Sequence, residues 1–258
     1  MPTQLLIYEQ AVPISKQRHK NWSVKASTDF AFAKKVNSVP LMAIEFSNAA
    51  AEYAVVFTGT EDEVMPAVIL GIRNQENLYL NEDDTWNAKY VPAFIRRYPF
   101  VFSSEDGGKT FTLCIDENYV GCNEEGRGER LFDAEGEMTR YTASVLEFLK
   151  EYQAQFQRTQ AFCKKLKELN LLESMRAQIK LNTGQQMGLT GFMAVSRDRL
   201  KALPAETLSE LVKADELELI YLHLQSMRNL NAMVDRVARQ NASKPDEEQA
   251  QENASTES

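Results

Sequence analysis

Two hydrophobic patterns divide the chain near residue 139. From residue 39 to about 116, short apolar runs alternate with turn residues, a pattern typical of β-strands. These runs are PLMAIEF, YAVVFTG, MPAVILGIR, NLYLN, PFVFSS and KTFTLCID. AVVF and AVILGI lack polar alternation, so we expect them to form strands that are buried on both faces. The first half of the chain is therefore predicted to be rich in β-strands.

The last two of these runs have the pattern of a β-hairpin. The segment EDGG separates FVFSS from KTFTLCI and places Asp106 and Gly107 at the bend, which is typical of a tight hairpin turn. Residues 104–111 also fit the Asp-box pattern S-x-D-x-G-x-T-W/F, in which the Asp carboxylate accepts N–H bonds within the turn. Propeller glycosidases carry several Asp-boxes. A single copy favours a plain hairpin over a sugar-active protein.

The second half of the chain shows helical periodicity. From Thr139 to about Asn170, apolar positions recur with spacings of four and three residues, as expected for an amphipathic helix. They are Val145, Leu149, Tyr152, Phe156, Thr159, Cys163 and Leu166. A second seam, from about Glu216 to Arg239, comprises Ile220, His223, Met227, Leu230, Val234 and Val237. We expect the two seams to face each other or a second copy of the chain, which would make a homo-oligomer.

The segments around and between these halves complete the fold prediction. Residues 177–198 are expected to add one or two strands, and a short helix is expected over Glu206–Val212. An acidic connector over Asp116–Glu137 holds eight Asp or Glu against two Arg, which indicates an exposed loop. Residues 241–258 contain no large apolar residue, so they are predicted to be a disordered acidic tail.

The fold class is thus predicted to be α+β. A β-rich N-terminal half packs with a C-terminal half of long amphipathic helices, and a disordered acidic tail follows. We expect four parts. They are an extended arm (1–38), a β-rich lobe with the acidic connector (39–138), a mainly helical lobe (139–240) and the tail (241–258).

Composition and charge narrow the classes of function. The net charge of −8 and the pI near 5.1 have the wrong sign for a general nucleic-acid binder. The three cysteines form no C-x-x-C pair, which argues against a zinc site or a disulfide framework and for a reducing compartment. No stretch has the length of an integral membrane segment. The apolar run Leu5–Tyr8 is too short for a Sec signal. We therefore expect a cytoplasmic protein, and an envelope role would require another export route.

The sequence offers no catalytic residue, cofactor or metal site that we can name. Histidine occurs twice, at His19 and His223, so a His-rich metal site is excluded. A calcium loop starting at Asp116 fails because Val120 and Arg127 occupy positions that require oxygen ligands. No P-loop, G-x-S-x-G or G-x-G-x-x-G pattern occurs, which disfavours nucleotide-dependent and serine-hydrolase activities.

Residues 86–100 concentrate aromatic rings, two prolines and adjacent arginines. Arginine forks bind carboxylates or phosphates, and Trp and Tyr provide rigid contact area. The predicted ligand-binding residues are Trp86, Tyr90, Arg96, Arg97 and, on the apolar seam of the last helix, His223. The alternative is structural: the aromatic residues pack the sheet, the arginines pair with the protein's own acids, and His223 is a core or interface residue.

Several stretches together resemble the bacterial SapC family. They are QLLIYEQAVPISKQRHKNWSV, NSVPLMAIEF, YVPAFIRRYPFVFS, GFMAVSRDRLKAL and ELELIYLHLQSMRNL. The resemblance spans about residues 3–238 and brings no catalytic motif with it. It implies an association with the bacterial surface layer (S-layer), and members also neighbour outer-membrane receptor and flavin-halogenase genes. These implications rest on association alone.

Three hypotheses follow for the function. The first is a non-catalytic binding or accessory protein that serves surface-layer production, export or modification and recognises a peptide or protein partner. The second is an enzyme or enzyme partner that acts on a small molecule or peptide through an unrecognised site. A pocket that holds Arg96, Arg97 or His223 beside a buried carboxylate would favour it. The third is a structural subunit of the surface layer.

Overall fold

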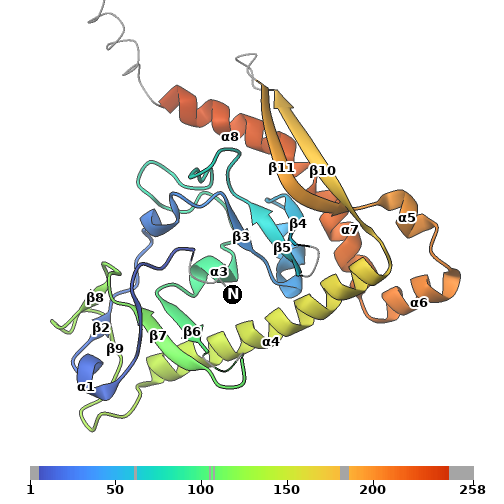
Figure 1. Cartoon of the computed structure of the whole chain (residues 1–258). Helices are drawn as coiled ribbons and strands as arrows, with labels where there is room; N and C mark the ends of the chain where they lie inside the picture. Colours follow the sequence, from blue (N-terminus) through green and yellow to red (C-terminus); the bar gives the residue numbers. More distant parts are fainter. Residues whose placement is uncertain (1–5, 61–62, 105, 107, 181–185, 244–258) are drawn as a thin grey trace, which may run out of the picture.

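The computed structural model describes residues 6–60, 63–104, 106, 108–180 and 186–243 (Figure 1). In these residues the strands form three antiparallel sheets, which come mainly from the first half of the chain, and the longer helices come from the second half. The α+β prediction is confirmed. The predicted tail lies outside the described residues from 244 onward.

The largest sheet has the strand order β10-β11-β4-β5-β3. Its strands are β3 (Ser38–Pro40), β4 (Val55–Gly59), β5 (Val64–Ile69), β10 (Leu172–Lys180) and β11 (Gln186–Val195). Val55, Val56 and Phe57 of β4 are fully buried, as expected for a central strand without polar alternation. In Figure 1 the β10–β11 hairpin extends from the body at one end of this sheet.

Two small sheets incorporate the N-terminal arm. The first has the order β1-β7-β6 and the second β8-β2-β9. Their strands are β1 (Ala11–Pro13), β2 (Ser23–Val24), β6 (Phe100–Ser103), β7 (Thr112–Asp116), β8 (Cys122–Asn123) and β9 (Glu129–Arg130). The arm also forms α1 (Lys16–His19) and the 3₁₀ turn η2 (Ala31–Ala33). Since it supplies one strand to each sheet, the arm is built into the fold.

The predicted hairpin is formed by β6 and β7. The Asp106 carboxylate accepts hydrogen bonds from the backbone N–H groups of Lys109 and Thr110, both at 2.9 Å, and from the Thr110 hydroxyl at 2.6 Å. The bonds from Thr110 are the main reason why the pKa of Asp106 lies well below its usual range. Phe111 stacks on Phe102. The Asp-box therefore acts as a local turn, and Gly107 lies outside the described residues.

The helix predicted from Thr139 is α4 (Arg140–Glu168). Thr139 caps its N-terminus by accepting a hydrogen bond from the Thr142 N–H. The apolar seam of α4 packs along β5, β6 and β9 and on the 3₁₀ turn η3 (Ala43–Glu45), whose Ala43 N–H donates to Thr159 Oγ1 at 2.9 Å. This seam faces the sheets, so the expected packing against the C-terminal helix seam was wrong for α4.

The helix predicted over Glu216–Arg239 is interrupted and forms two helices. They are α7 (Glu216–Ser226) and α8 (Asn229–Ser243), preceded by α5 (Arg197–Lys201) and α6 (Ala205–Lys213). The break occurs where two polar side chains bond to other parts of the backbone. Ser226 Oγ accepts a hydrogen bond from the Val55 N–H, and Asn229 Nδ2 donates to the carbonyls of Ala50 and Tyr53. Short-range periodicity does not reveal such long-range bonds.

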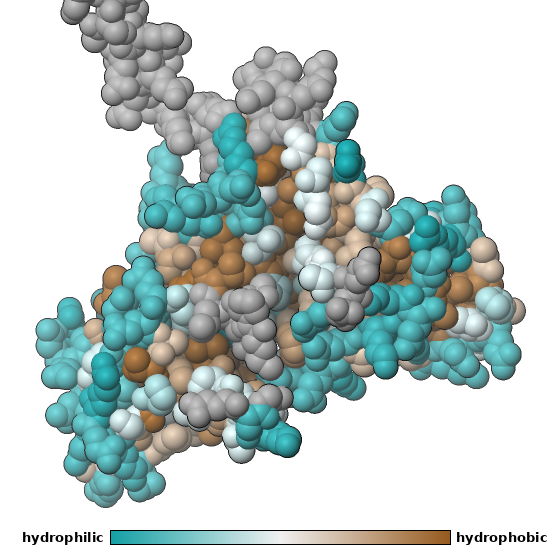
Figure 2. Space-filling model, viewed as in Figure 1, coloured by the Kyte–Doolittle hydropathy of each residue, from teal (hydrophilic) through white to brown (hydrophobic). Residues whose placement is uncertain are grey.

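The apolar side chains of the seams are covered within the chain. Ile220, Leu230 and Val237 are buried, and α7 packs on β4, β11 and α2 (Phe46–Ala49), while α8 packs on β10. Met227 and Val234 of the same seam are half-buried. None of the helices in the described part of the chain has the length and hydrophobicity needed to cross a membrane. Figure 2 shows hydrophobic residues reaching the surface in the middle of one face and hydrophilic residues at its periphery.

Candidate functional site

The seam between β4 and β11 is the most irregular part of the large sheet. Within the described residues, these two strands are paired at one position, Phe57 opposite Met193. In an antiparallel register, two further residues in each direction place Val55 opposite Val195 and Gly59 opposite Gly191. We call this contact the β4–β11 seam. Its two ends are built differently.

At the first end, His223 of α7 joins the two strands. Its Nδ1 lies 2.8 Å from the Val55 carbonyl oxygen, and its Nε2 accepts the Val195 N–H at 3.0 Å. Because Nε2 is an acceptor, Nδ1 carries the proton and donates to Val55. The imidazole thus replaces the direct hydrogen bond that a regular ladder would form at this position.

The environment of His223 keeps the ring neutral. The side chain is completely buried and contacts the Phe57 ring edge-on at 4.9 Å between centroids. Burial lowers the pKa of His223 to about 4, and the hydrogen bond to Val55 opposes this shift. A proton on Nε2 would also face the Val195 N–H, so both effects favour the neutral ring at neutral pH.

At the other end the strands separate at two glycines. Gly59 has φ +137° and Gly191 has φ +82°, conformations that glycine adopts most readily. On β11, Thr190 and Gly191 together stand opposite Arg176, so Gly191 belongs to a β-bulge. A bulge bends its strand and ends regular pairing. The sheet opens here because β11 turns away from β4.

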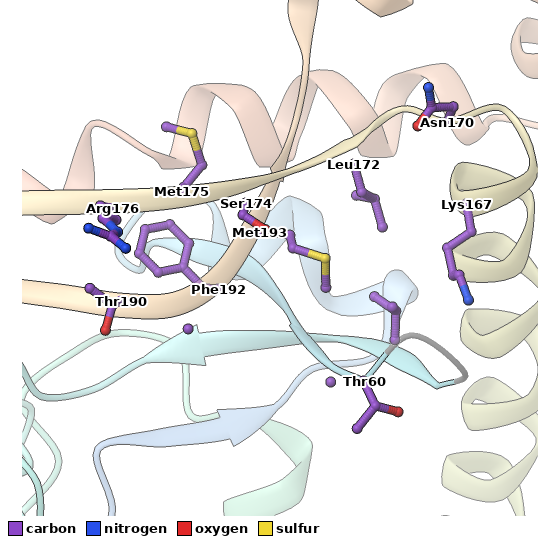
Figure 3. Close-up of a pocket in the computed structure, with 13 residues that line it drawn as sticks. Thr60, Lys167, Asn170, Leu172, Ser174, Met175, Arg176, Thr190, Phe192 and Met193 are labelled. Carbon is purple, nitrogen blue, oxygen red and sulfur yellow. The ribbon is translucent and has the colours of Figure 1, made fainter.

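The opening is a groove of about 1110 Å³, which we call the β4–β11 groove (Figure 3). Strands β4, β5, β10 and β11 and the end of α4 line it. The lining residues are Gly59, Thr60, Val64, Lys167, Asn170, Leu172, Ser174, Met175, Arg176, Thr190, Gly191, Phe192 and Met193. They include two cations and no carboxylate. Arg176 and Lys167 lie at opposite ends of the groove in Figure 3.

A smaller pocket shares Gly59 and Thr60 with this groove. It has a volume of about 260 Å³, and its lining includes Phe94, Tyr152, Phe156 and residues of β3 and β5. The tip of the β4–β5 hairpin is therefore flanked by two hollows.

Three of the predicted ligand-binding residues form a connected aromatic group. Trp86 Nε1 donates to the Tyr53 hydroxyl at 2.8 Å, and that hydroxyl in turn donates to the Tyr90 carbonyl. The Tyr90 hydroxyl donates to the buried Glu45 carboxylate at 2.7 Å, and the exposed Arg96 lies over the Tyr90 ring. This group ties the 86–97 segment to the body.

Arg97 is buried among aromatic rings. It is 3% exposed, and its guanidinium lies 4.3 Å from the Phe94 ring centroid, 4.9 Å from that of Tyr152 and 5.7 Å from that of Tyr8. Tyr8 belongs to the N-terminal arm and Tyr152 to α4. Arg97 therefore holds the arm, α3 (Ala93–Arg96) and α4 together.

The structure does not bring all five predicted ligand-binding residues to one site. His223 lies in the β4–β11 seam, among partners different from those of Trp86, Tyr90, Arg96 and Arg97. None of the five lines the β4–β11 groove or the smaller pocket.

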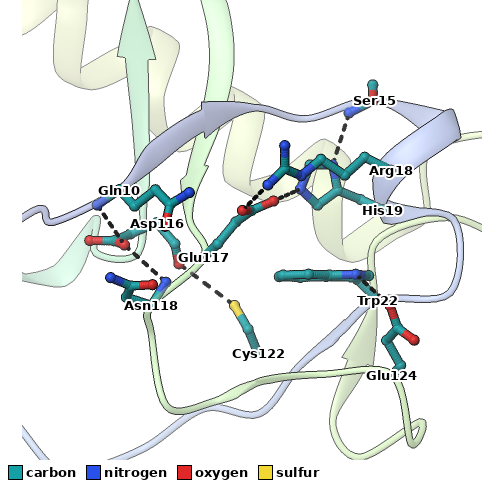
Figure 4. Close-up of polar contacts among 10 residues, drawn as sticks. All are labelled: Gln10, Ser15, Arg18, His19, Trp22, Asp116, Glu117, Asn118, Cys122 and Glu124. Carbon is teal, nitrogen blue, oxygen red and sulfur yellow. Dashed lines mark hydrogen bonds and ion pairs between the residues drawn. The ribbon is translucent and has the colours of Figure 1, made fainter.

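The N-terminal arm and the acidic connector form a polar cluster (Figure 4). The buried Asp116 carboxylate accepts the N–H groups of Glu9, Gln10 and Asn118. The buried His19 accepts the Ser15 N–H at Nδ1, so its Nε2 donates to Glu117 at 3.1 Å. The Asp116 carboxylate and both His19 ring nitrogens thus have hydrogen-bonding partners within the protein, and these bonds hold the arm in place.

Two cysteines are poor nucleophiles in this fold. Burial, with help from Asp116, raises the pKa of the Cys122 thiol to about 12, and burial alone does the same for Cys163. Both thiols stay protonated at neutral pH. Among the described residues, no three His, Cys, Asp or Glu side chains gather as a metal-binding group.

Sequence reasoning missed the β4–β11 groove. The glycines inside strand-like segments could have indicated it, because an isolated Gly in a strand is typical of a bulge or of a close backbone approach. Gly188 and Gly191 are two such residues, since both lie within β11.

Comparison with known proteins identifies the family. The family model described as SapC matches residues 14–233. The chain belongs to the SapC family. Neither the curated proteins nor the solved structures provide a match to this SapC protein.

Proposed function

We propose that this SapC protein is a non-catalytic binding protein that recognises a peptide or protein partner. It acts in the cytoplasm as an accessory to the production, export or modification of a bacterial surface layer. The β4–β11 groove is the observation that carries the proposal. It is open and lined by residues of four strands, by apolar side chains and by two cations, and such grooves suit extended polypeptides.

The packing of the arginine and aromatic segment supports binding over catalysis. An enzyme would be favoured by a pocket that places Arg96, Arg97 or His223 beside a buried carboxylate. Glu45 is a buried carboxylate in this region, but it is occupied by the N–H groups of Met42 and Ala93 and by the Tyr90 hydroxyl. Glu45 lines neither the β4–β11 groove nor the smaller pocket.

Peptide selection tests the proposal. Random dodecapeptides displayed on phage are selected on the immobilised full-length chain, and the enriched peptides are synthesised and titrated by fluorescence polarisation. Ser174 lines the groove and is exposed, so Ser174→Trp fills the groove from its wall. We expect this variant to lose about tenfold or more in affinity.

Gln178→Trp is the matched control. Gln178 is an exposed residue of the same strand and does not line the groove. We expect its peptide affinity to equal that of the wild type, with unchanged circular dichroism for both variants. Selection without enrichment, or equal affinities for wild type and Ser174→Trp, would show that the groove binds no peptide.

A further inference from the structure

Resting on the proposed function, we infer that the partner segment binds in the β4–β11 groove as an added β-strand that pairs with β4 at Gly59 and directs a carboxylate to Arg176. This assigns both the conformation and the charge of the ligand.

The N–H and C=O groups of Val55 point across the seam. The N–H donates to Ser226 Oγ at 3.0 Å, and the carbonyl accepts from His223 Nδ1. Backbone groups of a strand repeat their direction every two residues. Phe57 accordingly pairs with Met193, and from the same alternation we infer that the N–H of Gly59 is directed to the β4–β11 groove, which Gly59 lines.

The two ends of the seam satisfy the backbone in different ways. At the closed end, the side chains of His223 and Ser226 supply hydrogen-bonding partners for Val55. At the open end, the described residues of β11 give Gly59 no register partner. An extended ligand backbone carries the donors and acceptors that such an edge needs.

Gly191 leaves room for a close approach. A Cβ built on Gly191 would meet no atom within 4 Å, so open space lies beside this part of β11. Inserting a strand requires a spacing of about 10 Å, which is twice the usual inter-strand distance. The bulge at Gly191 bends β11 where this strand lines the groove, and we infer that the required spacing is reached there.

Arg176 determines the charge preference. It is exposed at the bulge, in a groove whose described lining contains no carboxylate, and it takes part in none of the ion pairs identified among the described residues. A guanidinium binds a carboxylate through paired hydrogen bonds. The ligand carboxylate belongs either to an Asp or Glu side chain or to a C-terminus.

Backbone methylation tests strand addition. The probe is the tightest peptide from the selection above, synthesised in two forms that carry N-methyl groups on alternate residues. A strand bonds one partner edge through alternate amides, so we expect at least one of the two forms to lose about tenfold or more in affinity. If both bind as tightly as the parent peptide, strand addition is wrong.

Charge reversal tests the Arg176 contact. We expect Arg176→Glu to weaken the acidic peptide by about tenfold, and replacement of the acidic residue by Lys to restore binding to this variant. Arg158→Glu, on an exposed position of α4 outside the groove, is the matched control with the same change in net charge. Selected peptides that have no acidic side chain and bind equally well with an amidated C-terminus, or equal losses in both variants, would refute the contact.

The outcomes separate this inference from the proposed function. If Ser174→Trp loses binding but neither N-methylation nor Arg176→Glu has an effect, the groove is still supported as a peptide site, whereas strand addition and the Arg176 contact are refuted. Peptides with a free and an amidated C-terminus distinguish a terminal carboxylate from a side chain. If amidation alone abolishes binding, the C-terminus is the group bound at Arg176.

Discussion

Val55 and Val195 lie opposite each other across the β4–β11 seam and are joined through the imidazole of His223. One ring nitrogen donates to the Val55 carbonyl and the other accepts the Val195 N–H. His223 thus closes the sheet at one end. Counted along β4 from Val55, the Phe57–Met193 pair, which is the one pair between the described residues of these strands, is two positions away, and Gly59 in the groove is four positions away. The Val195 N–H bonds to this ring, and the Val55 carbonyl accepts from it at 2.8 Å as well as from Ser226 Oγ at 3.4 Å.

Replacing His223 with Phe should lower the free energy of unfolding by about 2–5 kcal/mol, because it removes both hydrogen bonds inside the core. Urea denaturation followed by circular dichroism measures the change. Tyr221→Phe is the control, because Tyr221 lies on the same helix with an exposed side chain, and we expect it to change stability by less than about 0.5 kcal/mol. Equal effects in the two variants would contradict the bridging role.

Protonation of His223 should destabilise the fold in acid. Its pKa is lowered to about 4 in the folded state, below the ordinary value of 6.5. Its contribution to stability is therefore complete above pH 6.5 and is lost as the pH falls from 6.5 towards 4, by about 1.4 kcal/mol per pH unit. Urea titrations at several pH values should show a shallower slope for His223→Phe than for wild type in this window. Parallel slopes would mean that another group titrates.

The sequence predicts those elements that depend on local patterns. The runs AVVF and AVILGI form β4 and β5, the Asp106 turn joins β6 and β7, and the apolar spacing from Val145 to Leu166 corresponds to α4. Each pattern is contained within one element, so periodicity and turn chemistry suffice. The break between α7 and α8 is not predictable in this way, because Ser226 and Asn229 bond to backbone more than 170 residues away.

The candidate site was harder to predict, for two physical reasons. Aromatic and arginine residues occur both in binding surfaces and in packed cores, so their presence in a segment does not decide between the two. Arg97 is part of a packed core, where it lies over the Phe94 ring. The groove, in contrast, arises from a register that brings Gly59 opposite Gly191. The sequence does not predict this register, because β4 and β11 are far apart in the chain and their pairing is known only from the structure.

Arg97 and Arg96 should differ in their contribution to stability. Arg97→Ala should lower the free energy of unfolding by about 2–4 kcal/mol, because the guanidinium is desolvated among the rings of Phe94, Tyr152 and Tyr8. Arg96 is exposed, so Arg96→Ala should cost less than about 1 kcal/mol. Both are measured by urea denaturation. A smaller loss for Arg97 than for Arg96 would show that the aromatic surroundings contribute little.

The bulge at Gly191 offers a test of how the groove is kept open. Gly191 adopts φ +82°, whereas Gly188 of the same strand has no positive φ, and a Cβ built on either residue would meet nothing within 4 Å. Gly191→Ala should therefore lower the free energy of unfolding by about 1–2 kcal/mol through backbone strain alone. Gly188→Ala should stay within about 0.5 kcal/mol of wild type or gain stability.

Straightening of β11 would relieve the strain in Gly191→Ala and would also change the groove. In that case peptide affinity in the groove falls together with stability, and hydrogen exchange at residues 189–193 slows as β11 pairs with β4. Equal stability of the two alanine variants, measured by urea denaturation, would show that the bulge does not depend on the left-handed conformation of Gly191.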